Sequence, residues 1–329
     1  MTLLQVSNLK TYFHTSRGKV KAVNGVSFSI EQGEIMALVG ESGSGKSITG
    51  LTILGLVPKP NGIIEGGEIL FNGENLVGKT AKDYKKIQGE EIAMIFQNPL
   101  TAMDPSYKIG NQMIEIIRSR RKMTKKEAKE EAIDLLDLVG IHDPERVLAS
   151  YPHALSGGMR QRVMIAMAIS CKPKLLIADE PTTALDATIQ KQILDLLKKI
   201  NQELGTSILM ITHDFGVVAN LCDKVAVMYA GRIVEYGETQ DILHTPSHPY
   251  TKGLMGAMPE NQEVDGGGTH RLTQIEGTPP DLIQLPEGCS FRERCDYASD
   301  ICETAYPQAI YRSGEGSQMV HCYHTKEVI

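Results

Sequence analysis

The chain has 329 residues, 41% of them hydrophobic, and a formal net charge of −6 at pH 7. Its length suits one large domain with an appendage, or two domains. The acidic balance gives no indication of a nucleic-acid surface, so we expect no nucleic-acid partner. No run approaches the roughly 18 apolar residues that a spanning helix needs, and the first residues lack the charged and apolar regions of a signal peptide. We therefore expect a cytoplasmic chain that reaches a membrane only through another polypeptide.

The first 97 residues are rich in predicted strands. Apolar or alternating runs, separated by Gly-rich turns, occur at 3–6, 26–30, 35–39, 68–71 and 92–96. Residues from about 100 to 170 change to helical patterns. Thr124 and Glu127 form a capping-box match before one of these helices, and Gly140 fits its end.

Alternation of strands and helices then resumes. Buried strands are predicted at 175–178 and 208–211, with an amphipathic helix over 190–204 between them. The runs 225–229 and 232–236 flank an Ala-Gly pair and indicate a hairpin. These patterns predict an α/β core interrupted by a helical insert.

A local basic cluster occupies residues 118–126 and is followed by acidic residues. Its basic members are Arg118, Arg120, Arg121, Lys122, Lys125 and Lys126. A solvated helix face is the first interpretation, and a contact to a partner or to anionic lipid is the second.

The predicted strand 35–39 leads into residues 40–47, which read GESGSGKS and fit the pattern G-x-x-x-x-G-K-S. A Gly-rich turn between a buried strand and a helix can wrap a phosphate with its backbone N–H groups, and the helix dipole favours the same anion. Lys46 would reach the β- and γ-phosphates, and the Ser47 hydroxyl would ligate Mg²⁺. An ordinary Gly-rich turn is the alternative. The residues expected to bind the nucleotide are Gly40, Ser42, Gly43, Ser44, Gly45, Lys46, Ser47 and Ile48.

Two further motifs carry chemistry that fits a nucleotide site. Asp179 and Glu180 end the predicted strand 175–178, where Asp179 could hold Mg²⁺ and Glu180 could accept a proton from the attacking water. Two acids at a strand end are commonly structural, but their position after a phosphate loop favours catalysis. Residues 155–159 read LSGGM and open a helix, with Ser156 as the N-cap and two glycines that allow close approach of an anion. A simple capped helix start is the alternative there.

Together these motifs resemble those of ABC transporter ATPase subunits, over residues 1 to about 250. In that family the LSGG loop of one subunit closes over the γ-phosphate held by its partner, which implies that Ser156 and Gly158 serve the partner's ATP. The usual fifth residue is glutamine, whereas Met159 stands here. This departure leaves the Ser156 hydroxyl and the glycine amides intact, so we expect catalysis to persist.

The resemblance assigns roles to single residues elsewhere. Gln97 matches the glutamine that senses Mg²⁺ and the membrane subunit, and residues 184–186 match the D-loop. His213 matches the switch histidine that contacts the γ-phosphate and orients water, although an isolated His at a strand end is more often a cap or a surface residue. Phe13, or less favourably Tyr12, matches the aromatic residue that stacks on adenine, with a core aromatic as the alternative.

The fold that the resemblance implies is a RecA-like P-loop NTPase core with an antiparallel β subdomain and a helical insert at about 99–160, all within residues 1–258. A small irregular Cys-rich extension, residues 259–329, would follow, with a linker at 261–270. The extension holds 12 Leu, Ile, Val and Phe among 71 residues, and 12 acidic against 5 basic residues. Such a composition is close to the disordered range unless cross-links hold the segment together.

Four cysteines of the extension offer such a cross-link. Cys289, Cys295, Cys302 and Cys322 have the spacing C-x5-C-x6-C-x19-C. Zinc sites usually contain a cysteine pair that is closer in sequence, and disulfides are not expected in a cytoplasmic chain. The cysteine ligands of iron–sulfur clusters follow looser spacing rules. The spacing alone therefore leaves both zinc and a [4Fe–4S] cluster open. Residues 248–252, 277–280 and 288–295 resemble the C-terminal extension of oligopeptide and dipeptide importer ATPases, which favours the cluster and leaves zinc as the weaker alternative.

The resemblance implies an ATP-hydrolysing subunit of a di- or oligopeptide importer at the cytoplasmic face of the cell membrane. Its partners would be two transmembrane permease subunits and a second ABC ATPase, with a heterodimer favoured over a homodimer. An extracytoplasmic peptide-binding protein would act indirectly. The cargo is left open, since related systems carry nickel or oligosaccharides. The main alternative function is that of a soluble ABC ATPase in DNA repair or ribosome recycling. The single phosphate loop and the absence of extended heptads disfavour this alternative. A third interpretation is a non-catalytic regulatory subunit, and the presence of Glu180 and His213 disfavours it.

Overall fold

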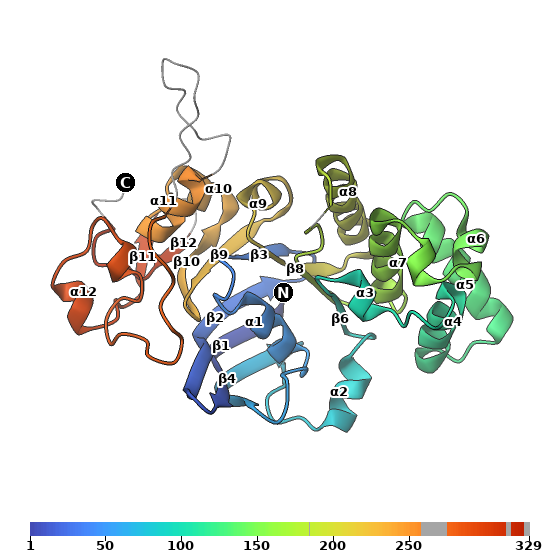
Figure 1. Cartoon of the computed structure of the whole chain (residues 1–329), viewed down its shortest axis with the longest axis horizontal. Coiled ribbons are helices and arrows are strands. Elements are labelled where there is room, and N and C mark those ends of the chain that lie inside the picture. The colour runs from blue at the N-terminus through green and yellow to red at the C-terminus, as the bar shows by residue number, and fades with distance from the viewer. Residues whose placement is uncertain (184, 258–274, 314–316, 326–329) are drawn as a thin grey trace, which may run out of the picture. The chain divides into compact units, whose positions relative to one another are not determined.

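The computed structural model describes residues 1–183, 185–257, 275–313 and 317–325 (Figure 1). Ala184 of the expected D-loop and the expected linker 261–270 lie outside these residues. The chain divides into two compact units: unit 1 comprises residues 1–78 and 211–329, and unit 2 comprises residues 79–210. We call residues 275–313 and 317–325 the C-terminal segment.

An antiparallel sheet opens unit 1, with the strand order β2-β1-β4-β5. Its strands are β1 (Thr2–Thr15), β2 (Gly18–Glu31), β4 (Gly62–Phe71) and β5 (Glu74–Asn75). The strands predicted at 3–6, 26–30 and 68–71 are confirmed, but β1 and β2 are much longer than those runs. The register shifts along β1, for example between Val6 and Leu9, interrupt the alternation of apolar and polar residues that the prediction depended on.

A second set of strands in unit 1 has the order β11-β12-β10-β9-β3. The set comprises β3 (Ile35–Val39), β9 (Lys224–Tyr229), β10 (Arg232–Glu238), β11 (Ile310–Ser313) and β12 (Ser317–Val320). The predicted hairpin is confirmed: Tyr229 pairs with Arg232, and the two residues between them, Ala230 and Gly231, have φ of 45° and 80°. Positive φ at both positions is the requirement of a type I′ two-residue turn.

The C-terminal segment contributes strands to unit 1 and is therefore not wholly irregular, contrary to the expectation. Strand β12 pairs with β10, with Tyr236 opposite Met319, and β11 pairs with β12. Val320 is fully buried in this pairing. An unpaired strand edge exposes backbone donors and acceptors, and pairing with β12 covers this edge of β10.

The described residues of unit 1 also form short helices. They are α1 (Lys46–Ile53), α9 (Phe215–Leu221), α10 (Thr239–His244), α11 (Pro249–Gly256), the 3₁₀ helix η3 (Arg292–Arg294) and α12 (Ile301–Thr304). Helix α1 follows β3 directly, in the place where the sequence predicts the helix of a phosphate loop.

The strands of unit 2 have the order β8-β7-β6. They are β6 (Ile92–Ile95), β7 (Leu175–Asp179) and β8 (Ser207–Thr212), and every residue of the three strands is buried. β6 and β7 are parallel, with Ile95 opposite Ala178. The three predicted apolar strands of this region are confirmed, and the parallel pairing brings the residues that follow β6 and β7 to the same edge.

Helices α3 to α7 follow one another between β6 and β7, as the helical patterns predict. The helices of unit 2 are α2 (Ala81–Ile87), α3 (Pro99–Ala102), α4 (Ile109–Arg120), α5 (Lys125–Leu138), α6 (Pro144–Ala149), the 3₁₀ helix η1 (Pro152–Ala154), α7 (Gly157–Ile169) and α8 (Ala187–Leu204). The capping box is confirmed, since Thr124 and Glu127 exchange hydrogen bonds at the start of α5. Across the part of the chain that the structure describes, each helix is too short or too polar to span a bilayer.

Candidate functional site

The loop between β3 and α1 has a backbone that only glycine can supply at two positions. A Cβ atom at Gly40 would lie 2.1 Å from the carbonyl oxygen of Met228, and one at Gly45 would lie 2.1 Å from that of Ala22. Gly45 also has a φ of 106° as the N-cap of α1. The GESGSGKS loop is therefore held tightly against β9 and β2, and Ser42 and Gly43 at its tip are exposed.

Lys46 folds back over this loop. Its side chain is buried, and Nζ donates hydrogen bonds to the carbonyl oxygens of Gly40 (2.7 Å) and Glu41 (2.8 Å). Ser44 is also buried, while Ser47 and Ile48 in the first turn of α1 are half-buried. A lysine ammonium, a helix N-terminus and an exposed loop tip are the groups from which phosphate sites are built.

His213 follows β8 in unit 1 and has an exposed side chain. The next residue, Asp214, caps α9 by accepting a hydrogen bond from the backbone N–H of Gly216 (2.8 Å). The capping role that the sequence left open for the histidine therefore belongs to Asp214.

The carboxyl ends of β6 and β7 bring Gln97 and Glu180 together within unit 2. Nε2 of Gln97 donates a hydrogen bond to Glu180 Oε2 at 2.7 Å, and Thr183 Oγ1 donates to the same oxygen at 3.0 Å. Asp179 is only 7% exposed at the end of β7. Glu180 has a φ of 46°, a left-handed conformation that is uncommon outside glycine and concentrates at functional sites. The strand ends thus hold an amide and two carboxylates, which suit Mg²⁺ and a proton acceptor.

Ser156 and Gly158 lie at the start of α7 in unit 2. The Ser156 hydroxyl accepts a hydrogen bond from the backbone N–H of Met159 (3.3 Å), so the predicted N-cap is confirmed. A Cβ atom on Gly158 would lie 3.0 Å from the Ile189 side chain of α8. Ser156 and Gly157 are exposed, which leaves this helix start open to a ligand from outside.

The two candidate adenine-stacking residues differ in burial. Tyr12 is 9% exposed, and its hydroxyl donates a hydrogen bond to Asn24 Oδ1 at 2.7 Å. Phe13 is half-buried on β1. Tyr12 is thus a core residue, and Phe13 is the better candidate of the two.

The four cysteines of the C-terminal segment line one cavity of about 10 Å³, together with His248 and Phe291. All four are free thiols. Burial raises the pKa of all three of the thiols Cys289, Cys295 and Cys322, that of Cys295 to about 11 and that of Cys322 to about 12. The neighbouring thiols add to each pKa shift. Within the described ranges, no group of three or more His, Cys, Asp or Glu side chains has the arrangement of a metal site. The structure therefore brings the expected ligands together without forming a metal centre.

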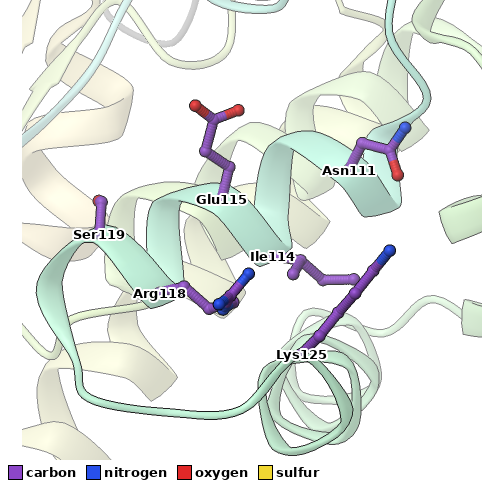
Figure 2. Close-up of a pocket in the computed structure, with 6 residues that line it drawn as sticks. All are labelled: Asn111, Ile114, Glu115, Arg118, Ser119 and Lys125. Atoms are coloured by element: carbon purple, nitrogen blue, oxygen red, sulfur yellow. The ribbon is translucent and has the colours of Figure 1, made fainter.

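The basic cluster of the helical insert borders a hollow of about 400 Å³ between α4 and the start of α5. Figure 2 shows Lys125 reaching from α5 toward Ile114 on α4, with Arg118 beside them. Glu115 also lines the hollow. Two basic residues of the cluster, Arg118 and Lys125, therefore line this hollow together with a carboxylate.

Comparison with known proteins identifies the family. The family "ABC transporter" matches residues 23–183, and the family "Oligopeptide/dipeptide transporter, C-terminal region" matches residues 234–302. The chain is 51% identical to the oligopeptide transport ATP-binding protein OppD of Bacillus subtilis, over 91% of this chain and 83% of that protein. It is 49% identical to the dipeptide transport ATP-binding protein DppD of the same organism, over 98% of this chain and 94% of that protein. This chain is an ATP-binding subunit of the oligopeptide/dipeptide ABC importer family.

Solved structures of similar fold support this family assignment. The ATP-binding cassette MJ0796, in a dimeric post-hydrolysis state bound to ADP and Pi, superposes with a TM-score of 0.64 at 28% identity. The match covers 72% of this chain and 98% of that one. The predicted P-loop NTPase fold and the assignment of the chain as an ABC ATPase are confirmed.

Two residues that the sequence analysis missed contact the phosphate loop. Tyr250 of α11 accepts a hydrogen bond from the Glu41 backbone N–H, and Arg294 of η3 pairs with the Glu41 carboxylate. Both lie in motifs, 248–252 and 288–295, that the sequence analysis used only to recognise the family. The acidic residue of the phosphate loop is a sequence signal for a positively charged partner such as Arg294, but the sequence contains no signal for Tyr250.

Proposed function

We propose that the chain hydrolyses ATP and so energises peptide import. The loop residues Gly40 to Ser47, Lys46 above all, bind the phosphates, and Phe13 stacks on adenine. The observation that carries this proposal is the loop itself, because its two sterically required glycines and its folded-back lysine place a Gly-rich turn and an ammonium group at the start of a helix, an arrangement that binds anions.

Hydrolysis is assigned to side chains at strand ends. Glu180 accepts the proton of the attacking water, Gln97 orients that carboxylate through their 2.7 Å hydrogen bond, and His213 contacts the γ-phosphate. Ser47, Gln97 and Asp179 would hold Mg²⁺, which neutralises phosphate charge when bound. Ser156 and Gly158 act on the ATP of a second ATPase, as their exposed helix start permits.

Substitution of Glu180 and Lys46 tests the hydrolytic site. Glu180→Gln should retain ATP binding and lose at least about a hundredfold in turnover, since it removes a general base. Lys46→Ala should lose ATP affinity as well. Glu91→Gln is the matched control, because Glu91 precedes β6 at the opposite end of the same strand pair and pairs with Lys174. Equal turnover in Glu180→Gln and Glu91→Gln would remove Glu180 from the base role.

The partners are those of the family. The chain docks on two transmembrane permease subunits at the cytoplasmic face of the membrane and pairs with a second ABC ATPase, in a heterodimer rather than a homodimer. An extracytoplasmic binding protein delivers di- or oligopeptides. The support is the match of residues 234–302 to the oligopeptide/dipeptide C-terminal family and the dimeric state of the structurally similar cassette.

The four cysteines are proposed to hold a [4Fe–4S] cluster, with zinc as the weaker alternative. Four thiols that converge on one cavity suit either group by donor type. The cavity of about 10 Å³ admits little more than one water-sized sphere, so a cubane requires the thiols to move apart. When bound, the group would cross-link a segment that has few large apolar residues to bury.

A further inference from the structure

An acidic side chain stands in the phosphate loop. Glu41 is the second residue of GESGSGKS, directly before the exposed tip formed by Ser42 and Gly43. A carboxylate near a triphosphate repels it, and the repulsion is stronger where protein excludes water. A fixed positive charge beside the carboxylate offsets this repulsion.

Arg294 supplies that charge from the C-terminal segment. Its Nη1 and Nη2 donate to the two carboxylate oxygens of Glu41 at 2.8 and 2.9 Å, the bidentate geometry of the stronger ion pairs. The Arg294 side chain is 5% exposed and that of Glu41 is 26% exposed. Water therefore screens this pair much less than it screens a surface pair.

The Arg294 guanidinium is itself fixed. Its Nε donates to the carbonyl oxygen of Glu276 at 2.9 Å, and weaker contacts of 3.3 Å reach the Tyr229 hydroxyl and the Ile275 carbonyl oxygen. With the two bonds to Glu41, these contacts equal the five N–H donors of a guanidinium. An arginine with every donor engaged has little freedom to leave its position.

The backbone of Glu41 is held by two further groups. Its N–H donates to the hydroxyl of Tyr250 at 2.8 Å, and its carbonyl oxygen accepts from Lys46 Nζ at 2.8 Å. Tyr250 is fully buried, with its ring centroid 4.6 Å from that of Tyr229 and 5.4 Å from that of Phe291. The conformation of Glu41, and through it one support of Lys46, thus depends on Tyr250 of α11, whose ring packs against Phe291 of the C-terminal segment.

We propose that Arg294 is a positioning residue for ATP binding: it neutralises and fixes Glu41, so that nucleotide affinity depends on the folded C-terminal segment. The proposal rests on the assignment of the phosphate loop as the ATP site. Arg294 immediately precedes Cys295, so the cysteine cavity and the phosphate loop are linked by two consecutive residues. The link makes the C-terminal segment part of the nucleotide site of unit 1.

Equilibrium binding of a fluorescent ATP analogue to the full-length chain tests this role. Arg294→Met keeps the side-chain length and removes the charge, and it should raise the Kd roughly tenfold while turnover at saturating ATP changes little. Adding Glu41→Gln to Arg294→Met removes the unpaired carboxylate and should restore the Kd to within about threefold of the parent. Arg17→Met is the matched control, because Arg17 also reaches the C-terminal segment, at Asp281, through an exposed 3.7 Å pair, and should leave the Kd unchanged.

Two results would overturn the proposal: a parental Kd in Arg294→Met, or a weakened Kd that Glu41→Gln does not relieve. The second result would mean that the arginine only stabilises the fold of the segment. Lys46→Ala separates this proposal from the assignment of the ATP site. If Lys46→Ala binds the analogue as well as the parent does, the assignment of the site fails; if it does not and Arg294→Met binds normally, only the role of Arg294 fails.

Discussion

Glu235 shows what burial does to a single carboxylate in this chain. It is fully buried on β10, and its two oxygens accept from the backbone N–H groups of Ser247 (2.6 Å) and His248 (3.1 Å) and from Nε2 of Gln318 (2.7 Å). Burial nevertheless raises its pKa to about 7, although these hydrogen bonds act in the opposite direction. The carboxylate joins β10 to β12, so its protonation bears on the attachment of the C-terminal segment.

The raised pKa predicts that the contribution of Glu235 to stability falls as the pH rises from 6.5 to 8.5. The folded pKa of Glu235 exceeds the ordinary value of 4.5, so its contribution is complete below 4.5 and is lost as the pH rises through about 7. Burial lowers the pKa of His248 to about 3, so stability from this histidine increases as the pH rises through 6.5 and offsets part of the Glu235 loss. The loss due to Glu235 is about 1 kcal/mol, measured as the difference between the parent and Glu235→Gln in urea unfolding at the two pH values.

The matched variants for this measurement are Glu235→Gln and Glu238→Gln on the same strand. Glu235→Gln should remove the fall in stability between pH 6.5 and 8.5. Glu238 is exposed beside Lys224, and its substitution should leave the pH dependence as in the parent. A parental slope in Glu235→Gln would assign the pH dependence to other groups.

At the scale of elements, the start of α7 is predicted to act on the ATP of a partner. Ser156→Arg places a large cation at the exposed N-terminus of α7, where it opposes both the helix dipole and close contact with another subunit. ATP binding by the isolated chain should stay near the parental value, while ATP-dependent dimer formation and turnover are lost. Ser119→Arg, an exposed position on α4, is the control. An equal loss of ATP binding by the isolated chain would show that the loop acts on its own subunit.

The proposed cluster predicts the iron and sulfide content and the colour of the purified protein. Protein purified anaerobically should be brown, with iron and acid-labile sulfide in about equal amounts. Replacing Cys289, Cys295, Cys302 or Cys322 with Ser should bleach it and make the C-terminal segment sensitive to protease, whereas Cys171→Ser, outside the cavity, should not. A colourless protein that binds stoichiometric zinc would contradict the iron–sulfur cluster. The four cysteines would then cross-link the segment through zinc.

The sequence predicted the elements whose signals are local. The apolar runs at 175–178 and 208–211 predicted β7 and β8, and the Ala-Gly pair predicted the β9–β10 hairpin, because periodicity and turn chemistry act over a few residues. Pairing of β12 with β10 depends on contacts between distant segments, which no periodicity encodes. The Gln97–Glu180 and Glu41–Arg294 pairs are of the same kind, the second joining residues 253 positions apart. Motifs could therefore name Gln97 and Glu180 singly but could not find Arg294.

At the scale of the whole molecule, we propose that the chain carries both halves of a nucleotide sandwich: the phosphate loop before α1 in unit 1 and the exposed start of α7 in unit 2. With two identical copies, each copy would complete the site of the other. We propose that the chain pairs with a related but different ATPase, so that each site combines residues of two chains. Oligomeric state with ATP bound decides between the two arrangements.

The last prediction concerns that pairing. Glu180→Gln slows hydrolysis and should trap the closed state, since closure is driven by ATP that is bound and not consumed. With Mg·ATP, the variant alone should remain a monomer of 36.1 kDa in light scattering. Co-expressed with the second ATPase subunit of its transporter, it should form a one-to-one complex that Ser156→Arg prevents. A stable ATP-dependent dimer of the chain alone, at the same concentration, would contradict the heterodimer and assign both sites to two identical subunits.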